Sequence, residues 1–188
     1  MQITPGASQA NIRSIKVDLP QRLPARSATI QHACPYKVFS SDPAACPAVS
    51  VVGSATVTTP LLGAAMRGPI YLVAHGGAGF PDIVLLLQGQ DLTVDLSGEL
   101  YVDEHNITSA IFRAVPDVPI SRLGLTLPEG NHSILVAGRS LCKGALHMLS
   151  AITAQNGASA KPSVTVKVKG CKRAAATRQQ KLEPFGLG

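Results

Sequence analysis

The sequence is short of aromatic and charged residues. It has no tryptophan, three tyrosines and four phenylalanines among 188 residues. Charged residues make up 15% of the chain, against roughly one quarter in an ordinary globular protein, which argues against a coiled coil or a highly charged helical surface. No apolar run reaches the length of about 18 residues that a membrane-spanning helix needs, so we expect no transmembrane segment. No complete catalytic signature is present either.

Apolar residues are plentiful. They make up 45% of the chain, which is enough for a packed core and excludes wholesale disorder. The length suits one domain, or one domain with a fragment of another.

Short apolar segments separated by Gly/Pro turns predict an all-β fold. They recur roughly every 8 to 15 residues, which is typical of an antiparallel β-sandwich, Ig-like or jelly-roll-like. Gly98 is expected to form a turn between two strands. One short helix is expected near the N-terminus, within Arg22–Phe39, with Pro35 as its break or bend. We expect strands at 11–19, 51–58, 69–74, 83–88, 92–96, 99–102, 109–114, 120–127, 133–137, 146–154 and 164–168.

The formal net charge of +6 lies entirely at the C-terminal end. Residues 1–160 hold 10 basic and 10 acidic side chains, whereas residues 161–188 hold seven basic ones against Glu183. Nucleic-acid binding favours a basic stripe with aromatic side chains for stacking, and only Phe185 lies near, so we expect no specific nucleic-acid site. Residues 172–188 are predicted to be a disordered basic tail, with a weak contact to an anionic polymer as the alternative.

The chain has four cysteines, Cys34, Cys46, Cys142 and Cys171. An even count in a β-rich chain of low charge indicates two disulfides and an oxidising compartment. Three pairings are open, and the nearest-neighbour set, Cys34–Cys46 and Cys142–Cys171, is the one we predict because each bond closes a short segment. Structural zinc sites usually bring cysteines in close pairs, and none occurs here, so we predict no metal and no cofactor.

An internal repeat suggests that the chain is part of a longer array. The segment Ile15–Pro20 and the segment Leu123–Pro128 share alternating apolar residues followed by Leu-Pro, at an offset of 108 that also places Cys34 on Cys142. The N-terminus lacks the basic and apolar regions of a signal peptide, so we expect a piece of an exported protein, with a cytosolic chain of free thiols as the alternative. Residues 1–45 are then the last strand and helical connector of a preceding repeat, and residues 46–171 form the β-sandwich repeat.

Two motifs are weighed for chemistry. His75-Gly76-Gly77 is similar to the oxyanion loop of esterases, but no Gly-x-Ser-x-Gly elbow accompanies it, so a glycine turn is predicted and no catalytic residue is assigned. Asp82 and Asp117 each follow a proline and are expected to cap turns, with calcium binding as the alternative. The acidic side chains considered with them are Asp91, Asp95, Glu99, Asp103 and Glu104.

Several short motifs of the sequence resemble repeats in large secreted or surface proteins of soil actinobacteria. The resemblance covers nearly the whole chain to Cys171 and implies export, tandem β domains and disulfides at the cysteine positions. It implies no known activity. These motifs are Ala45-Cys46-Pro47, Gly53, 56–62, 68–73, Phe80-Pro81-Asp82, Leu87-Gln88-Gly89, 115–121 and 154–158.

The sequence therefore favours a non-catalytic structural or adhesion-type domain of an exported bacterial surface protein, located outside the cell. Its partners would be other repeats of the same polypeptide or surface molecules. The alternative is a module that binds carbohydrate or a cell-wall polymer, with Tyr71, Tyr101 and His75 as candidate ligand contacts. A remote alternative is an esterase-like hydrolase that uses the His75-Gly76-Gly77 loop.

Overall fold

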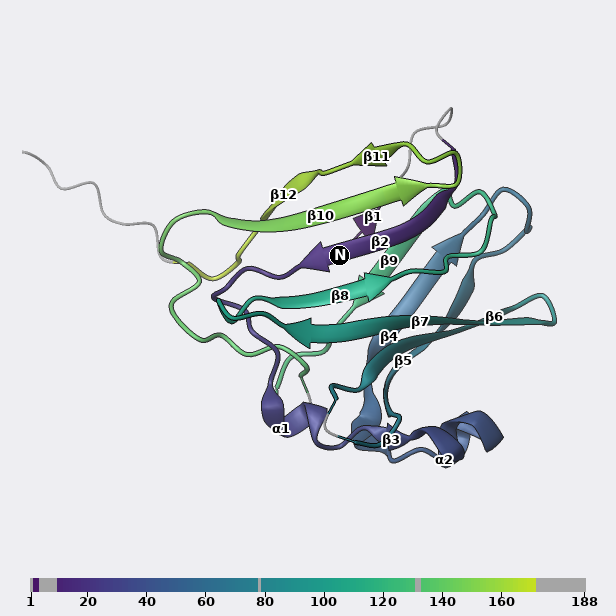
Figure 1. The fold of residues 1–188 in the computed structure, drawn as a ribbon, viewed down its shortest axis with the longest axis horizontal. Coiled ribbons are helices and arrows are strands. Elements are labelled where there is room, and N and C mark those ends of the chain that lie inside the picture. The colour runs from purple at the N-terminus through teal and green to yellow at the C-terminus, as the bar shows by residue number, and fades with distance from the viewer. Residues whose placement is uncertain (1, 4–9, 78, 131–132, 172–188) are drawn as a thin grey trace, which may run out of the picture.

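The protein folds as one long antiparallel sheet that curls around its own inner face (Figure 1). The computed structural model describes residues 2–3, 10–77, 79–130 and 133–171. The strands are β1 (Gln2–Ile3), β2 (Ile12–Asp18), β3 (Cys34–Pro35), β4 (Val51–Thr58), β5 (Met66–Ala74), β6 (Asp82–Gly89), β7 (Leu92–Val102), β8 (Thr108–Phe112), β9 (Arg122–Thr126), β10 (Leu146–Ala154), β11 (Ser159–Ala160) and β12 (Ser163–Val166).

The strand order is β1-β9-β4-β5-β6-β7-β8-β2-β10-β11. Strand β12 also pairs with β10, and β3 adds a short parallel pairing to β5. Two short helices, α1 (Ser27–Ile30) and α2 (Tyr36–Ser41), and the 3₁₀ helices η1 (Pro43–Ala45) and η2 (Ala48–Ser50) connect β2 to β4. No helix in the described part of the chain is long and apolar enough to cross a membrane.

The sheet changes direction within β7. Residues up to Gly98 pair with β6, whereas residues from Glu99 onward pair with β8. A Cβ atom on Gly98 would lie 2.6 Å from the ring of Phe112, a core residue of β8. Glycine at this corner therefore lets the aromatic ring pack directly against the backbone where the sheet bends.

Strands β5 and β6 are buried on both faces. Ile70, Leu72 and Leu85 belong to the inner core, whereas Val73 and Val84 belong to a second cluster on the outer face. The second cluster includes Cys34 and Phe39, so α2 and the Cys34–Cys46 bond cover this part of the sheet. Burial on both sides explains why these two strands are nearly continuous apolar runs.

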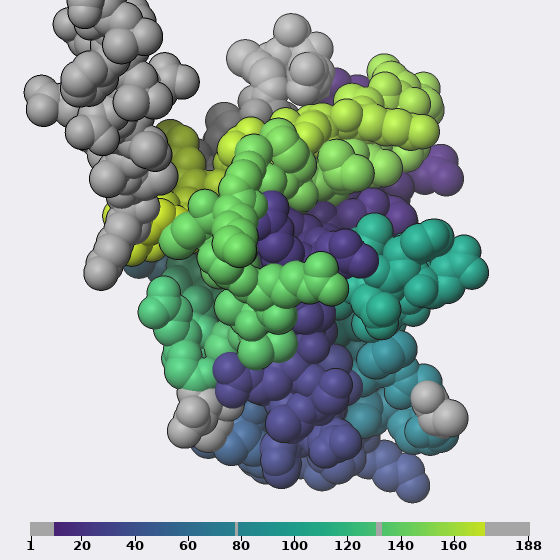
Figure 2. Space-filling view, turned by 90° about the vertical axis from the view of Figure 1, so that its left-hand side faces the viewer, coloured from purple at the N-terminus to yellow at the C-terminus, as the bar shows by residue number. Residues whose placement is uncertain are grey.

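The segment after β9 packs across the N-terminal residues, as the green and purple atoms of Figure 2 show. The backbone N–H of Arg26 donates to the carbonyl of Ile134 at 2.7 Å, and that of Gly138 donates to Arg22 at 3.0 Å. The guanidinium of Arg22 also donates to the carbonyls of Ser140 and Lys143. This segment was expected to hold a strand at 133–137, but it forms only one isolated bridge, from Leu135 to Ala25.

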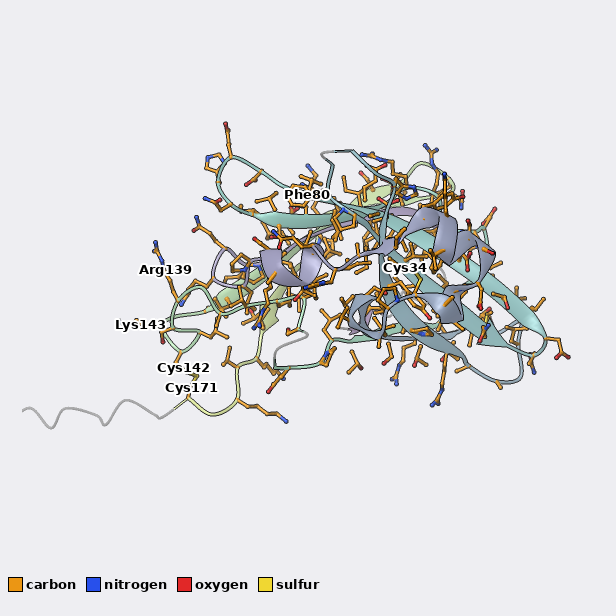
Figure 3. All side chains as sticks on the ribbon, turned by 90° about the horizontal axis from the view of Figure 1, so that it is seen from below. Cys34, Phe80, Arg139, Cys142, Lys143 and Cys171 are labelled. Atoms are coloured by element: carbon orange, nitrogen blue, oxygen red, sulfur yellow. A yellow bond between two sulfur atoms is a disulfide. The ribbon has the colours of Figure 1, made fainter. Side chains whose placement is uncertain are left out.

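The antiparallel all-β fold and both disulfides are confirmed. Cys34–Cys46 and Cys142–Cys171 are bonded as predicted, which indicates an oxidising, extracellular-type environment. Figure 3 shows the second bond at the periphery, beside Arg139 and Lys143.

A sandwich of two sheets is not confirmed, because β7 hydrogen-bonds to both β6 and β8 and joins the strands into one sheet. The turn expected at Gly98 is wrong for the same reason. The structure has two short helices where one was expected. Pro35 lies at the start of the second, a position at which the fixed φ of proline is compatible with a helix.

The division at residue 45 and the tandem-repeat origin stay predictions. Within this structure β2 lies between β8 and β10, and the Cys34–Cys46 bond joins the two sides of that division. The basic tail at 172–188 lies outside the described residues.

Candidate functional site: an apolar cavity inside the curled sheet

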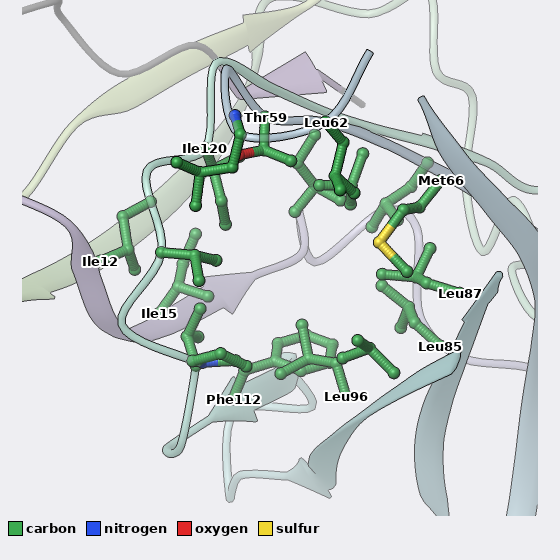
Figure 4. A pocket seen from close by; sticks show the side chains of 18 of the residues that line it. Ile12, Ile15, Thr59, Leu62, Met66, Leu85, Leu87, Leu96, Phe112 and Ile120 are labelled. Carbon is green, nitrogen blue, oxygen red and sulfur yellow. The ribbon is translucent and has the colours of Figure 1, made fainter. Parts of the chain in front are cut away.

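A cavity of about 220 Å³ lies on the inner face of the sheet (Figure 4). The labelled side chains of Ile15, Met66, Leu85, Leu96 and Phe112 point around its open centre. The remaining lining residues are Ile12, Val17, Val57, Thr59, Leu61, Leu62, Leu87, Leu92, Val94, Val115, Pro116, Val118, Ile120, Leu123 and Leu125.

The alternation of strand side chains builds this lining. In β7, Leu92, Val94 and Leu96 line the cavity, whereas Thr93 and Asp95 are exposed, as the period of two predicts. Strands β2, β6 and β9 contribute in the same way. Among the lining residues only Thr59 carries a hydroxyl, and its oxygen already accepts a hydrogen bond from the backbone of Leu61 at 3.2 Å. The cavity therefore offers a ligand apolar contact and almost no polar recognition.

The cavity opens at one end of the sheet. The loops that follow β4, β6 and β8 all lie at this end, because consecutive strands run antiparallel. Leu61 and Val118 lie in the first and third of these loops, and Leu92 begins β7 directly after the second; they are 65%, 36% and 50% exposed. All three also line the cavity, so its walls continue outward into an exposed apolar rim.

The cavity is large in energetic terms. Unfilled volume in an enclosed apolar core costs about 24 cal/mol per Å³, so about 5 kcal/mol is the upper limit for a cavity of 220 Å³ with an open mouth. A whole domain is stable by only about 5 to 15 kcal/mol. Water molecules are poorly stabilised in such a space, because an apolar cavity offers them no hydrogen-bond partners. A hydrocarbon group is the occupant that would recover this free energy.

A second, wider groove of about 1080 Å³ runs along the inner face toward β10 and β12. Apolar side chains such as Leu127, Ile134 and Met148 line it together with the hydroxyl residues Thr108 and Ser150. This groove shares Ile15, Val17 and Phe112 with the cavity and is lined mostly by apolar side chains, but it is broad and defines no ligand shape.

His75 lies at the other end of the sheet, in the loop between β5 and β6. Its Nε2 is 2.9 Å from Oδ2 of Asp82, and its ring is 4.8 Å from that of Tyr36. Gly76 and Gly77 adopt φ values of +84° and +82°, a turn conformation that favours glycine. In the described part of the chain, no hydroxyl or thiol group is hydrogen-bonded to this imidazole.

The two tyrosines considered for ligand contact lie apart. Tyr71 is 7% exposed and packs edge-on against Phe39, with ring centroids 5.3 Å apart. Tyr101 contacts Lys16 on β2, whose Nζ lies 5.5 Å from the ring centroid. Hydrogen bonds to Tyr101 and to Asp18 raise the pKa of Lys16. Tyr71 is therefore buried in the outer core, whereas Tyr101 is partly exposed with Lys16 over its ring.

Asp82 and Asp117 hydrogen-bond to side chains, whereas Asp103 caps a turn by accepting from the backbone N–H groups of His105 and Ile107. Asp82 bonds to His75, and Oδ1 of Asp117 accepts from the side chain of Asn11 at 2.8 Å. Among the described residues no three His, Cys, Asp or Glu side chains come close enough to hold a metal ion. The calcium alternative therefore has no donor cluster in this part of the chain.

The cavity was not identified from the sequence. Inward-facing apolar residues read as ordinary core, because periodicity does not show whether the space between strands is filled. The available signal was the placement of apolar residues in loops, as in Pro60-Leu61-Leu62 and Val118-Pro119-Ile120. Leucine and isoleucine at loop positions with no strand partner indicate a wall or rim.

Comparison of the chain with protein-family models, with curated proteins and with solved structures finds no match.

Proposed function

We propose that this protein is a non-catalytic domain of an exported bacterial surface protein, and that it binds an apolar ligand inside its curled sheet. The observation that carries the proposal is the apolar cavity with an open mouth. Within this proposal the domain also has a structural or adhesion role in a tandem array, and the two disulfides are compatible with that role.

The lining limits the chemistry of the ligand. No charged side chain lines the cavity, so the part of the ligand that enters it is uncharged. The volume of 220 Å³ exceeds the roughly 150 Å³ of an apolar cavity that holds benzene. A saturated chain of several carbons fits this description. Each buried methylene contributes about 0.8 kcal/mol, which is about a fourfold gain in affinity.

The test is displacement of the uncharged fluorophore N-phenyl-1-naphthylamine from delipidated protein by straight-chain alcohols. We expect affinity to rise about fourfold per methylene and then to level off when the cavity is full. No displacement, or a rise that never levels off, would contradict a cavity of defined size.

A matched pair of variants makes the test specific. Val57 lines the cavity from β4, whereas Val164 of β12 does not line it and is half-exposed. Val57→Phe should shorten the chain length at which affinity levels off, because the ring takes up cavity volume. Val164→Phe should leave that length unchanged. An equal response of the two variants would place the ligand elsewhere.

A further inference from the structure

We infer that the rim of the cavity docks on an anionic lipid bilayer, from which the ligand's hydrocarbon chain enters. This rests on the proposed function, because it names the source of the ligand for the same cavity. The partner is the surface of a bilayer that contains phospholipids with acidic headgroups.

The rim is an apolar surface formed by two loops and the first residue of β7. Leu61, Leu92 and Val118 are exposed at one end of the sheet, and each also lines the cavity. The loop at 59–65 carries no charged side chain at all. An exposed apolar surface that is continuous with an apolar interior suits a hydrocarbon phase, because a chain can pass between them without crossing water.

Three arginines lie near this rim, at the ends of the strands that lead to it. Arg13 is in β2, Arg67 in β5 and Arg122 in β9, and all three are exposed at the strand ends nearest the mouth. No ion pair involves them within the described ranges. Arginine side chains can extend to lipid phosphates while apolar tips enter the bilayer.

Acidic residues also lie at this end of the sheet. Asp117, beside Val118, is hydrogen-bonded to Asn11, and Asp91 occupies the turn before Leu92. Asp95 lies further along the outer face of β7. Asp91 and Asp117 lie in the loops that follow β6 and β8, whereas the loop at 59–65 carries leucines and no carboxylate. The apolar tips therefore carry the contact, and the arginines select an anionic surface.

The experiment is sedimentation of the protein with vesicles of phosphatidylcholine alone or with half phosphatidylglycerol. We expect binding to the mixed vesicles and much weaker binding to phosphatidylcholine. The double variant Leu61→Ser/Val118→Ser should lower the partition coefficient by at least about tenfold. The control is Leu149→Ser, which removes a leucine that is 52% exposed on β10 and outside the rim, and it should bind as the unchanged protein does.

A second pair of measurements separates this inference from the proposed function. Val57→Phe should impair binding of decanol in vesicle-free solution while it still sediments with vesicles. Arg67→Gln/Arg122→Gln, whose side chains do not line the cavity, should still bind decanol in solution while its sedimentation with the mixed vesicles weakens. Failure of decanol binding in every protein would overturn the proposed function. Decanol binding without vesicle sedimentation would overturn the docking inference alone.

Two further outcomes would also overturn the docking inference. One is an equal loss of sedimentation in Leu149→Ser and in the rim variant, which would show non-specific apolar adsorption. The other is a complete loss of sedimentation in Arg67→Gln/Arg122→Gln together with unchanged sedimentation of the rim variant. That result would show a purely electrostatic contact.

Discussion

Filling the cavity should stabilise the protein, and this outcome runs against the usual effect of enlarging a buried side chain. The change is Val57→Phe in β4, at a buried position that lines the cavity. Enlarging a residue in a well-packed core destabilises by about 1 to 3 kcal/mol. At a wall of unfilled volume the sign reverses, because each Å³ filled recovers about 24 cal/mol. We expect a gain of about 1 kcal/mol, typical of cavity-filling changes.

The matched control lies in the same strand. Val52 is fully buried but does not line the cavity, so Val52→Phe should destabilise by about 1 to 3 kcal/mol. Urea unfolding of delipidated protein measures both, with the slope compared to confirm that the unfolded states are equivalent. A gain of 1 kcal/mol corresponds to about 2 to 4 °C in Tm for a chain of this size. Destabilisation by Val57→Phe equal to that by Val52→Phe would refute an unfilled cavity at Val57.

Three other changes test the fold. Replacing both cysteines of the Cys34–Cys46 disulfide by alanine should lower the free energy of unfolding by about 3 kcal/mol, measured by urea unfolding, because the bond closes a short loop over the outer core. Gly98→Ala should lower the Tm, with a loss of about 1 to 3 kcal/mol, because a Cβ atom would press on the ring of Phe112. Arg113 lowers the pKa of Glu99 from its ordinary value of 4.5. Stability from this exposed pair is therefore present above about pH 4.5 and lost as the pH falls through the lowered pKa, so urea midpoints of the unchanged protein and Glu99→Gln should converge in acid.

Much of the architecture was predictable because local chemistry determines it. Alternation in 92–96 gave the correct inward residues, and the spacing of the cysteines gave both disulfides. Pro35 interrupts the helical region because its ring fixes φ and removes a backbone donor. These features depend on one segment or on a short loop, and the sequence of that segment specifies them.

The curl of the sheet was not predictable from the same local signals. Glycine is read as a turn residue, but Gly98 continues β7 because the missing Cβ makes room for the ring of Phe112, a residue from the next strand. The strand expected at 133–137 fails because that segment packs across Arg22 and Arg26 instead of joining a ladder. Which strands face each other, and how much space remains between them, depends on contacts between distant residues.

The direct test of an internal apolar site is a nuclear Overhauser measurement between bound decanol and assigned methyl groups. We expect contacts from the alkyl chain to the methyl groups of Ile15, Leu85 and Leu96, which line the cavity from three strands. Contacts confined to exposed Leu149, which lines neither the cavity nor the second groove, or none at saturating decanol, would contradict ligand binding inside the curled sheet.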